Sequence, residues 1–167
     1  MVAVYKFLLT LHVLGAVILI GPFVLVAFMG NRAIRVHDAE DIHRAARYLA
    51  RFAIGSTIVA LLGAATLGLS DRYTFRTPWV IISLTLWLIA MGVATGYTVP
   101  AMRRAGHLVE QGVIPPAGET DVAATATELG VKERLDNIAG RVVGSATLVL
   151  VTMVIITILM VVRPFGS

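Results

Sequence analysis

Four long apolar segments separated by polar stretches organise the chain. They cover about residues 5–29, 52–69, 79–99 and 142–162. A helix needs about 20 apolar residues to cross a bilayer, and it satisfies its own backbone hydrogen bonds there. The pattern therefore predicts an all-α fold, a four-transmembrane-helix bundle of two helical hairpins, in one integral membrane domain over residues 1–167.

The polar stretches at about 30–51 and 101–141 predict cytoplasmic loops with helical extensions. Asp38 is placed to cap an extension of the second span, whose apolar positions recur at helical spacing, at Ile42, Ala46, Leu49 and Phe52. In the second loop, the proline pair at 115–116 predicts a break. Two short polar helices are expected after it, over 119–129 (with Asp121 as its cap) and 131–138, docked under the bundle or on a partner subunit.

The basic residues predict the orientation of the bundle. Ten of the 14 Lys and Arg residues lie in these two loops, and four lie on the opposite side. Cytoplasmic loops of membrane proteins carry the excess of Lys and Arg. We therefore expect a multi-pass protein of a bacterial cytoplasmic (inner) membrane with both termini outside the cytoplasm. This orientation also accounts for the net charge of +4.

Composition narrows the classes of function. Hydrophobic residues make up 57% of the chain and charged residues 14%, against roughly 45–50% and about 25% in soluble domains. This excludes a soluble enzyme, a nucleic-acid-binding domain and a disordered chain. The absence of cysteine excludes disulfides, thiolate metal sites and cysteine nucleophiles.

Small residues at four-residue spacing predict where the helices approach closely, because membrane helices associate through close packing. One such face of the second span carries Ser56, Ala60, Ala64 and Gly68. The pairs Gly92 with Gly96 and Gly140 with Gly144 lie at similar depth, which predicts contact between the third and fourth spans. In the first span, Gly21-Pro22 predicts a kink.

His12 is the one ionisable side chain placed deep in a span, roughly 10 Å from the outer end of its helix. No carboxylate accompanies it in the membrane, which argues against a proton- or ion-coupled transporter. His12 could ligate haem iron or copper, or move a proton. The structural alternative is a hydrogen bond to a hydroxyl of comparable depth, at Thr66, Ser83, Thr85 or Thr157.

A haem b at His12 would need a second axial ligand. Met153 and Met160 in the fourth span are the candidates in this chain, with the second His12 of a homodimer as a further one. The other three histidines, His37, His43 and His107, fall on the cytoplasmic side and are expected to be solvated loop residues. No residue is assigned a catalytic role, because the zincin and nucleophile-elbow motifs are missing.

Several motifs carry a resemblance to known families. The segment from Lys6 through His12 to Pro22 resembles the opening helix of a bacterial family of predicted integral membrane proteins of unknown function. Thr77-Pro78-Trp79 and Arg163-Pro164 are also similar to it. His-Val-Leu-Gly-Ala from His12 is similar to the first helix of the copper-resistance D membrane domain. More distantly, the architecture resembles the small haem-dependent protoporphyrinogen oxidases, which implies His12 as a haem ligand.

Together these observations favour a non-enzymatic structural or accessory protein, embedded in the lipid bilayer and packed with itself or with a larger membrane complex. The alternative is a haem- or copper-binding protein for redox chemistry or metal handling, centred on His12. A small haem-dependent oxidoreductase is the third interpretation, and it alone would make the chain an enzyme.

Overall fold

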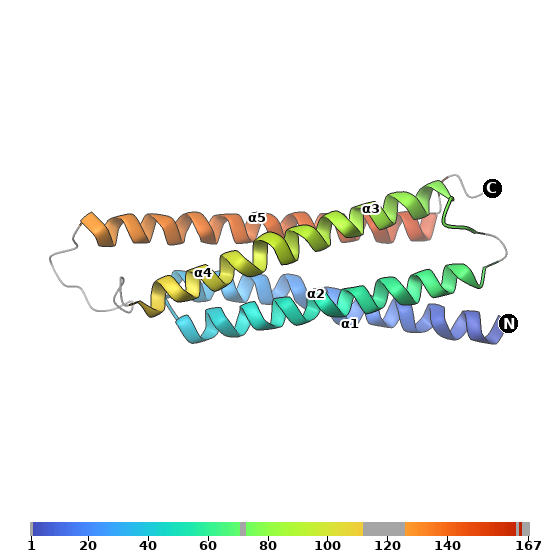
Figure 1. Ribbon diagram of the computed structural model, residues 1–167, viewed down its shortest axis with the longest axis horizontal. Coiled ribbons are helices and arrows are strands. Elements are labelled where there is room, and N and C mark those ends of the chain that lie inside the picture. The colour runs from blue at the N-terminus through green and yellow to red at the C-terminus, as the bar shows by residue number, and fades with distance from the viewer. Residues whose placement is uncertain (1, 71–72, 112–125, 163, 165–167) are drawn as a thin grey trace.

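The computed structural model describes residues 2–70, 73–111, 126–162 and 164, and every regular element within them is helical. In chain order the elements are α1 (Val2–Arg35), α2 (Ala39–Gly68), α3 (Pro78–Val93), the π-helical turn η1 (Ala94–Thr98), α4 (Val99–Glu110) and α5 (Ala126–Val162). Because α3, η1 and α4 run into one another, four long rods lie along the molecule (Figure 1). All four are long and apolar enough to cross a membrane, which confirms the predicted fold class.

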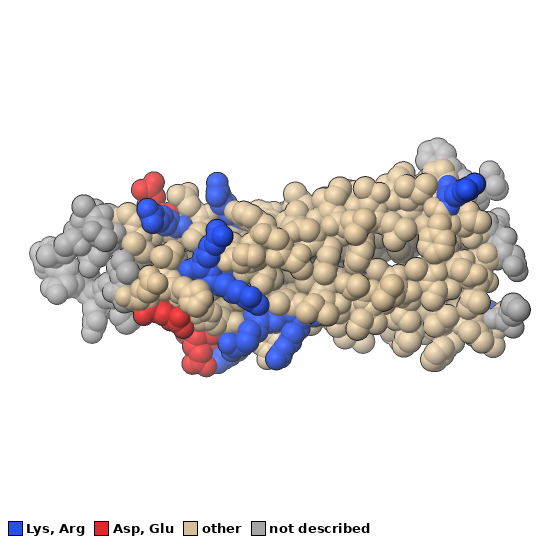
Figure 2. Space-filling model, viewed as in Figure 1, with Lys and Arg blue, Asp and Glu red and all other residues tan. Residues whose placement is uncertain are grey.

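The rods form an up-and-down bundle. α1 packs along α2, α2 packs on α4, and α5 packs on both α1 and α3. The start of α1 and the end of α5 lie at one end, and the α1–α2 turn and the end of α4 lie at the other (Figure 1). Most of the charged side chains visible in Figure 2 gather at the second end. We call this the charged end, formed by residues 30–51, 101–111 and 130–141.

Burial differs between the charged end and the rest of the bundle. The largest fully buried side chains are Ile34, Ile42, Leu49, Met102, Leu135, Val142 and Thr98. All but the last two belong to the charged end. Elsewhere large apolar side chains face outward: Val17 is 68% exposed and Leu25 63% exposed. A helix that is apolar all round belongs in a membrane. At the charged end, apolar side chains are buried and charged side chains face outward, as in a protein in water. Along the remainder, apolar side chains face outward, as in a protein in lipid.

The turn between α1 and α2 confirms the predicted cap. Asp38 accepts a hydrogen bond from the backbone N–H of Asp41 at 3.0 Å on its Oδ1, which satisfies a free donor of the first turn of α2. His37 has a φ of 56°, a left-handed conformation that histidine adopts more readily than most residues. This conformation reverses the chain within a few residues, so α1 and α2 form a tight hairpin.

The second loop differs from its prediction. Residues 131–138 are not a separate polar helix but the early turns of α5, which continues without a break to Val162. The reason is a buried stripe that continues toward the span with helical spacing, at Val131, Leu135, Ala139 and Val142. The proline pair and the predicted cap Asp121 lie outside the described residues, and so does most of the helix predicted over 119–129.

The third and fourth spans contact each other as predicted, through α3, η1 and α5, but their glycine pairs do not make the contact. A Cβ atom built on Gly92, Gly96, Gly140 or Gly144 would meet no atom within 4 Å. Close approaches occur instead between α1 and α2, where a Cβ on Gly55 would lie 3.1 Å from the Leu19 side chain, and at α4, where a Cβ on Gly106 would lie 2.6 Å from His43 of α2. Glycine spacing shows that a helix face is flat, but only the tertiary structure shows which neighbour that face meets.

Pro100 accounts for the wide turn η1. Proline has no backbone N–H to donate, and in a regular helix its ring would press against the carbonyl four residues earlier, at Gly96. The preceding turn widens, and the Val99 N–H donates to the Ala94 carbonyl five residues back. The Thr98 hydroxyl in this turn lies 2.9 Å from Ser145 Oγ, in a buried hydrogen bond that ties the widened turn to α5. In α1 the helix continues through Pro22.

Candidate functional sites

His12 reaches from α1 to the backbone of α2. Its Nδ1 lies 2.7 Å from the carbonyl oxygen of Val59. The ring rests against Gly63, where a Cβ atom would come within 2.7 Å of His12 Cε1. Gly15, one turn along α1, also meets Val59, whose Cγ2 would be 3.1 Å from a Cβ there. Glycines on both helices therefore make room for the imidazole.

This hydrogen bond identifies the hydrogen-bearing nitrogen of His12. A carbonyl oxygen can only accept, so Nδ1 donates. In an uncharged ring the lone pair is then on Nε2. The predicted hydroxyl partner is wrong: Thr66, Thr85 and Thr157 each donate to a carbonyl of their own helix, and the buried Ser83 hydroxyl has no hydrogen-bond partner among the described residues. Helical threonines readily satisfy themselves in this way, since the carbonyl four residues back lies within reach.

The methionines proposed as partners of His12 are both half-buried. Met153 lines a small cavity inside the bundle, of about 20 Å³, together with Leu19, Phe23 and Ser56. This volume is about that of one water molecule. The contacts of His12 with Val59 and Gly63 involve neither methionine, so ligation by Met153 or Met160 stays a prediction.

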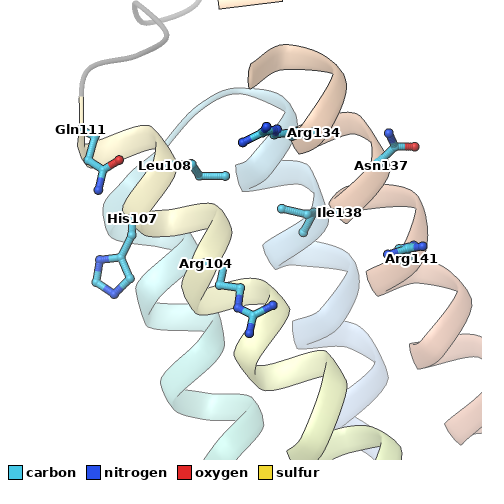
Figure 3. A pocket seen from close by; sticks show the side chains of 8 residues that line it. All are labelled: Arg104, His107, Leu108, Gln111, Arg134, Asn137, Ile138 and Arg141. Carbon is cyan, nitrogen blue, oxygen red and sulfur yellow. The ribbon is translucent and has the colours of Figure 1, made fainter. Parts of the chain in front are cut away.

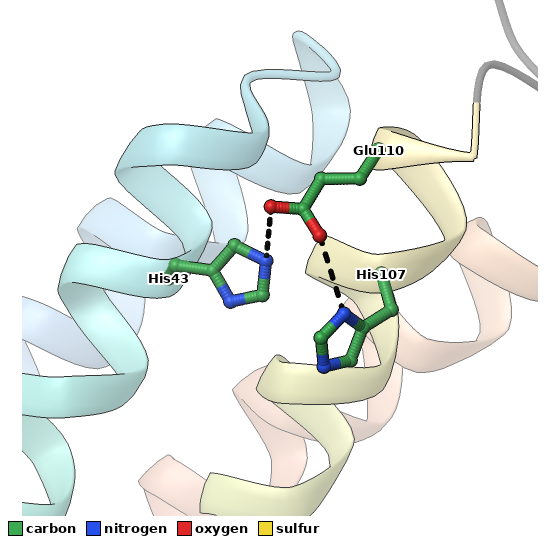
Figure 4. A group of neighbouring side chains, drawn as sticks. All are labelled: His43, His107 and Glu110. Carbon is green, nitrogen blue, oxygen red and sulfur yellow. Dashed lines mark hydrogen bonds and ion pairs between the residues drawn. The ribbon is translucent and has the colours of Figure 1, made fainter.

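Three side chains that are far apart in the sequence meet at the charged end. His43 comes from α2, and His107 and Glu110 come from successive turns of α4 (Figure 4). His43 Nε2 lies 3.1 Å from Glu110 Oε1, and His107 Nδ1 lies 3.2 Å from Glu110 Oε2. One donor atom from each of the three residues lies within 4.8 Å of the other two. We call this group the His–Glu cluster.

Glycine again allows the approach. A Cβ atom on Gly106 would lie 2.6 Å from His43 Cε1 and 2.7 Å from its Nε2, so the ring rests directly on α4. The His43 side chain is 19% exposed, whereas that of His107 is 66% exposed. The two rings meet edge to face, with centroids 5.0 Å apart. His43 is therefore held by packing, and His107 and Glu110 lie on the solvent side of it.

The cluster favours the charged form of Glu110. Partial desolvation acts to raise the pKa of its carboxyl, but the hydrogen bond with His107 and the nearby imidazoles of His107 and His43 outweigh this and lower that pKa from its ordinary value of 4.5. His43 Nε2 is close enough for an ion pair but is not aligned for a hydrogen bond, so this buried nitrogen has no hydrogen-bond partner. An anionic carboxylate and two imidazoles thus face one another.

His43 and His107 were expected to be solvated loop residues, but both lie in helices, and the His43 side chain is mostly buried. The two lie 64 positions apart, and no local spacing relates them. One signal was present: His107 and Glu110 are three residues apart, which puts them on one helix face. His37 lies at the α1–α2 turn and is not part of the cluster.

A basic groove lies between α4 and α5 at the charged end, with a volume of about 560 Å³ (Figure 3). Arg104 lines it from α4, and Arg134 and Arg141 line it from α5. Leu108 and Ile138 supply apolar lining. None of the three arginines forms an ion pair within the described part of the chain. The groove therefore combines concentrated positive charge with an apolar wall.

Comparison with known proteins gives one match. A family model described as "Predicted integral membrane protein (DUF2269)" matches residues 6–164. No curated protein and no solved structure matches the chain. The match spans nearly the whole chain and includes His12, the His–Glu cluster and the basic groove. The likeness to the copper-resistance D membrane domain stays a prediction.

Proposed function

We propose that this chain, which belongs to the DUF2269 family of predicted integral membrane proteins, is a non-enzymatic structural or accessory protein whose helices pack against a second copy or within a larger membrane complex. The observation that carries the proposal is the outward position of Gly92, Gly96, Gly140 and Gly144, with empty space where each Cβ would be. Flat glycine faces of this kind bring membrane helices close together. In the described part of the chain no atom packs against them.

The surroundings of these glycines support the same interpretation. Farther along α5, on the side that Gly144 shares, Leu148, Val151 and Ile155 are 42–52% exposed. A stripe that begins with glycine and continues with branched apolar residues suits close helix contact at one end and side-chain packing along the rest. A second α5 or a helix of another subunit would fill it.

Substitution of the glycines tests this proposal. Gly140→Leu and Gly144→Leu would add bulk to the outward face, at positions where a Cβ atom meets no described atom within 4 Å. We expect the wild-type protein to run as a dimer or larger complex in native-membrane extracts and in mild detergent, and both variants to shift to monomer. Gly68→Leu is the matched control, because its Cβ also meets no atom within 4 Å. A wild-type protein that is a monodisperse monomer, alone in native membranes, would contradict the proposal.

A second candidate function is favoured by the geometry of His12. Ligating histidines in metal sites commonly donate their other ring N–H to a backbone carbonyl, which orients the ring for the metal. His12 donates from Nδ1 to Val59, so its Nε2 is the nitrogen available for haem iron or copper. The cavity beside Met153 is only about 20 Å³, so a haem would have to lie at the lipid-facing side of His12 or between two copies.

Absorption spectra of the detergent-purified protein, as isolated and after dithionite, test this second candidate, with metal analysis of the same sample. Haem ligation predicts a Soret band that shifts on reduction and is lost in His12→Ala. Copper ligation predicts stoichiometric copper that is lost in the same variant. His37→Asn, at a histidine outside both candidate metal sites whose left-handed φ asparagine tolerates, is the control and should leave both signals intact. A featureless spectrum without copper leaves His12 with its packing role.

The proposed location is a bacterial cytoplasmic membrane with the charged end in the cytoplasm, supported by the basic residues gathered there (Figure 2). Because the chain has no cysteine, single introduced cysteines report topology directly. Glu133→Cys at the charged end should resist a membrane-impermeant thiol reagent in intact cells, and Val4→Cys should react. The reverse pattern would place the termini in the cytoplasm.

A further inference from the structure

We propose that the His–Glu cluster binds a first-row divalent metal ion of the zinc class, held by His43, His107 and Glu110. The site lies at the charged end, away from His12 and from the outward glycines. This proposal therefore does not depend on either of the functions proposed above. The donors are two imidazole nitrogens and one carboxylate oxygen, one from each residue.

The spacing of the donor atoms fits such an ion. At metal–ligand distances of about 2.0–2.1 Å, two ligands of a tetrahedral site lie roughly 3.3 Å apart. His43 Nε2 lies 3.1 Å from one oxygen of Glu110, Oε1, and His107 Nδ1 lies 3.2 Å from the other, Oε2. Taken with one atom from each residue, the three donors lie within 4.8 Å of one another, so they must move somewhat closer together around a metal. Ligation requires a rotation of the exposed His107 and Glu110 side chains, and each facing ring nitrogen must present its lone pair instead of a hydrogen.

The kind of donor sets the kind of metal. Imidazole suits Zn²⁺, Ni²⁺, Co²⁺ and Cu²⁺, whereas Mg²⁺ and Ca²⁺ prefer oxygen ligands throughout. Two histidines with one carboxylate leave a fourth position for water. Because His107 and Glu110 are well exposed, this position is open to solvent. The arrangement suits reversible binding of an ion taken from solution.

Packing of His43 distinguishes the cluster from a chance meeting of surface side chains. Its ring lies on the Gly106 backbone, where no other residue would leave room, and its Nε2 is buried without a hydrogen bond. That nitrogen lies 3.1 Å from Oε1 of Glu110 (Figure 4). One ligand is thus fixed before the metal arrives, which reduces the ordering cost of binding.

A bound ion would connect α2 to α4 beyond the apolar segments. His43 precedes the second span by nine residues and Glu110 follows the third by eleven, roughly 13 and 16 Å along their helices. These two helices pack against each other. An ion that binds only the folded arrangement stabilises it in proportion to the logarithm of its concentration. The metal would act as a clamp on the charged end.

Calorimetric titration of the full-length protein with Zn²⁺ tests the proposal, using protein in detergent without a histidine tag and first stripped with a chelator. We expect one ion per chain and a melting temperature that rises with added Zn²⁺. Co²⁺ should give the visible absorption bands of a nitrogen- and oxygen-ligated ion. Binding of fewer than about half an ion per chain would overturn the proposal. A titration curve that the variants below leave unchanged would also overturn it.

The variants separate ligation from folding. His43→Ala, His107→Ala and Glu110→Gln should each weaken Zn²⁺ binding at least about tenfold. Glu110→Gln keeps the shape of an exposed side chain, so its loss of binding cannot come from misfolding. His37→Asn, a histidine outside the cluster whose left-handed φ asparagine tolerates, is the control and should bind as the wild type does. Equal binding by Glu110→Gln would remove Glu110 from the site and overturn it as described.

A separate observation carries a second inference. We infer that the basic groove between α4 and α5 binds the phosphate group of an anionic phospholipid. Arg141 stands at the start of the fourth apolar segment, and Arg134 lies about two helical turns farther out. The groove therefore spans the level of the lipid headgroups, where basic pockets between transmembrane helices bind anionic lipids.

The chemistry of the groove matches a phospholipid better than a free ion. Guanidinium groups bind phosphate oxygens in pairs of hydrogen bonds, and Asn137 and Gln111 add amide donors at the same groove. Leu108 and Ile138 offer apolar contact, which inorganic phosphate cannot use but a glycerol backbone and the first methylenes of an acyl chain can.

Native mass spectrometry of the protein with phosphatidylglycerol or phosphatidylcholine, which share acyl chains, tests this inference. We expect selective retention of phosphatidylglycerol, weakened about fivefold by Arg104→Gln and by Arg134→Gln. Arg47→Gln, an exposed arginine of α2 outside the groove, should bind as the wild type does. Equal retention of the two lipids, an equal effect of Arg47→Gln, or displacement of the lipid by millimolar inorganic phosphate would each overturn it.

Discussion

Two histidines of this protein use one packing device in opposite surroundings. His12 rests on Gly63 of the next helix, and His43 rests on Gly106. In the apolar part of the bundle His12 meets only a backbone carbonyl, at Val59. At the charged end His43 meets a carboxylate and a second imidazole. A glycine on the neighbouring helix lets the imidazole ring come close. The polar groups around the ring then determine whether the histidine only packs there or joins a group of possible metal ligands.

The largest loss of stability should come from adding a Cβ atom at the glycines on which the two histidine rings rest. Gly63→Ala places a Cβ 2.7 Å from His12, and Gly106→Ala places one 2.6 Å from His43. We expect Gly63→Ala to lower the free energy of unfolding by about 1–3 kcal/mol, the usual cost of overpacking, as measured by denaturation in detergent. Gly106→Ala should cost less, because His43 can swing toward water, but it should abolish Zn²⁺ binding.

Gly68→Ala is the control for both, since its Cβ meets no atom. Alanine is the better helix former, so this variant should be neutral or slightly stabilised. If Gly63→Ala behaves in the same way, the ring does not rest on α2 as described, and the comparison between the two histidines fails.

Removal of the His12 hydrogen bond should have the next largest effect. His12→Leu introduces an apolar side chain of similar length, which cannot form the hydrogen bond to the Val59 carbonyl. We expect a loss of about 1 kcal/mol, typical of interhelical hydrogen bonds in membranes, measured by the same denaturation assay. A loss several times larger would show that His12 also holds something else, and would favour a bound cofactor.

The third prediction concerns pH at the charged end. Because the folded pKa of Glu110 is lowered from 4.5, its ionised form stabilises the fold at pH values above 4.5. That contribution is lost as the pH falls below 4.5 through the lowered pKa. The melting temperature of metal-free wild-type protein should therefore exceed that of Glu110→Gln at pH 6 and converge with it on acidification. A difference that grows on acidification would contradict this assignment.

The smallest effect is expected beside the cluster. Arg44 forms exposed ion pairs with Glu40 and Asp41, both at 2.6 Å. Exposed pairs of this spacing contribute about 0.3–0.5 kcal/mol. Arg44→Ala removes both pairs and should therefore change stability by less than about 1 kcal/mol, while Zn²⁺ binding should stay intact. Because this variant leaves Glu40 and Asp41 unpaired, a tighter binding of Zn²⁺ would mean that the acidic charge of this helix face, and not only the three ligands, attracts the ion.

Much of the fold could be predicted because it depends on local pattern. Apolar length defined four spans, and the Asp38 cap followed from side-chain chemistry within one turn. The partners of those helices could not be predicted in the same way. Gly140 and Gly144 were expected to face the third span and instead face outward, because a small-residue face fits any flat neighbour equally well.

The candidate sites divide in the same way. His12 was identified from the sequence because an ionisable residue in an apolar run stands out by itself. Its carbonyl partner was not, since backbone acceptors are the same at every position. The His–Glu cluster was missed because His43 and Glu110 belong to different helices, and charged side chains at helix ends are ordinarily solvated.

The sequence by itself determined that this is a four-helix membrane protein with a charged end, because burial in lipid depends on the apolar length of each segment alone. Only the tertiary structure decided which glycines receive a histidine, which glycines face outward, and that two imidazoles and a carboxylate meet across α2 and α4. The physical reason is that helix pairing depends on the rotation of each helix about its axis. Packing of all four helices sets that rotation together, and no single segment encodes it.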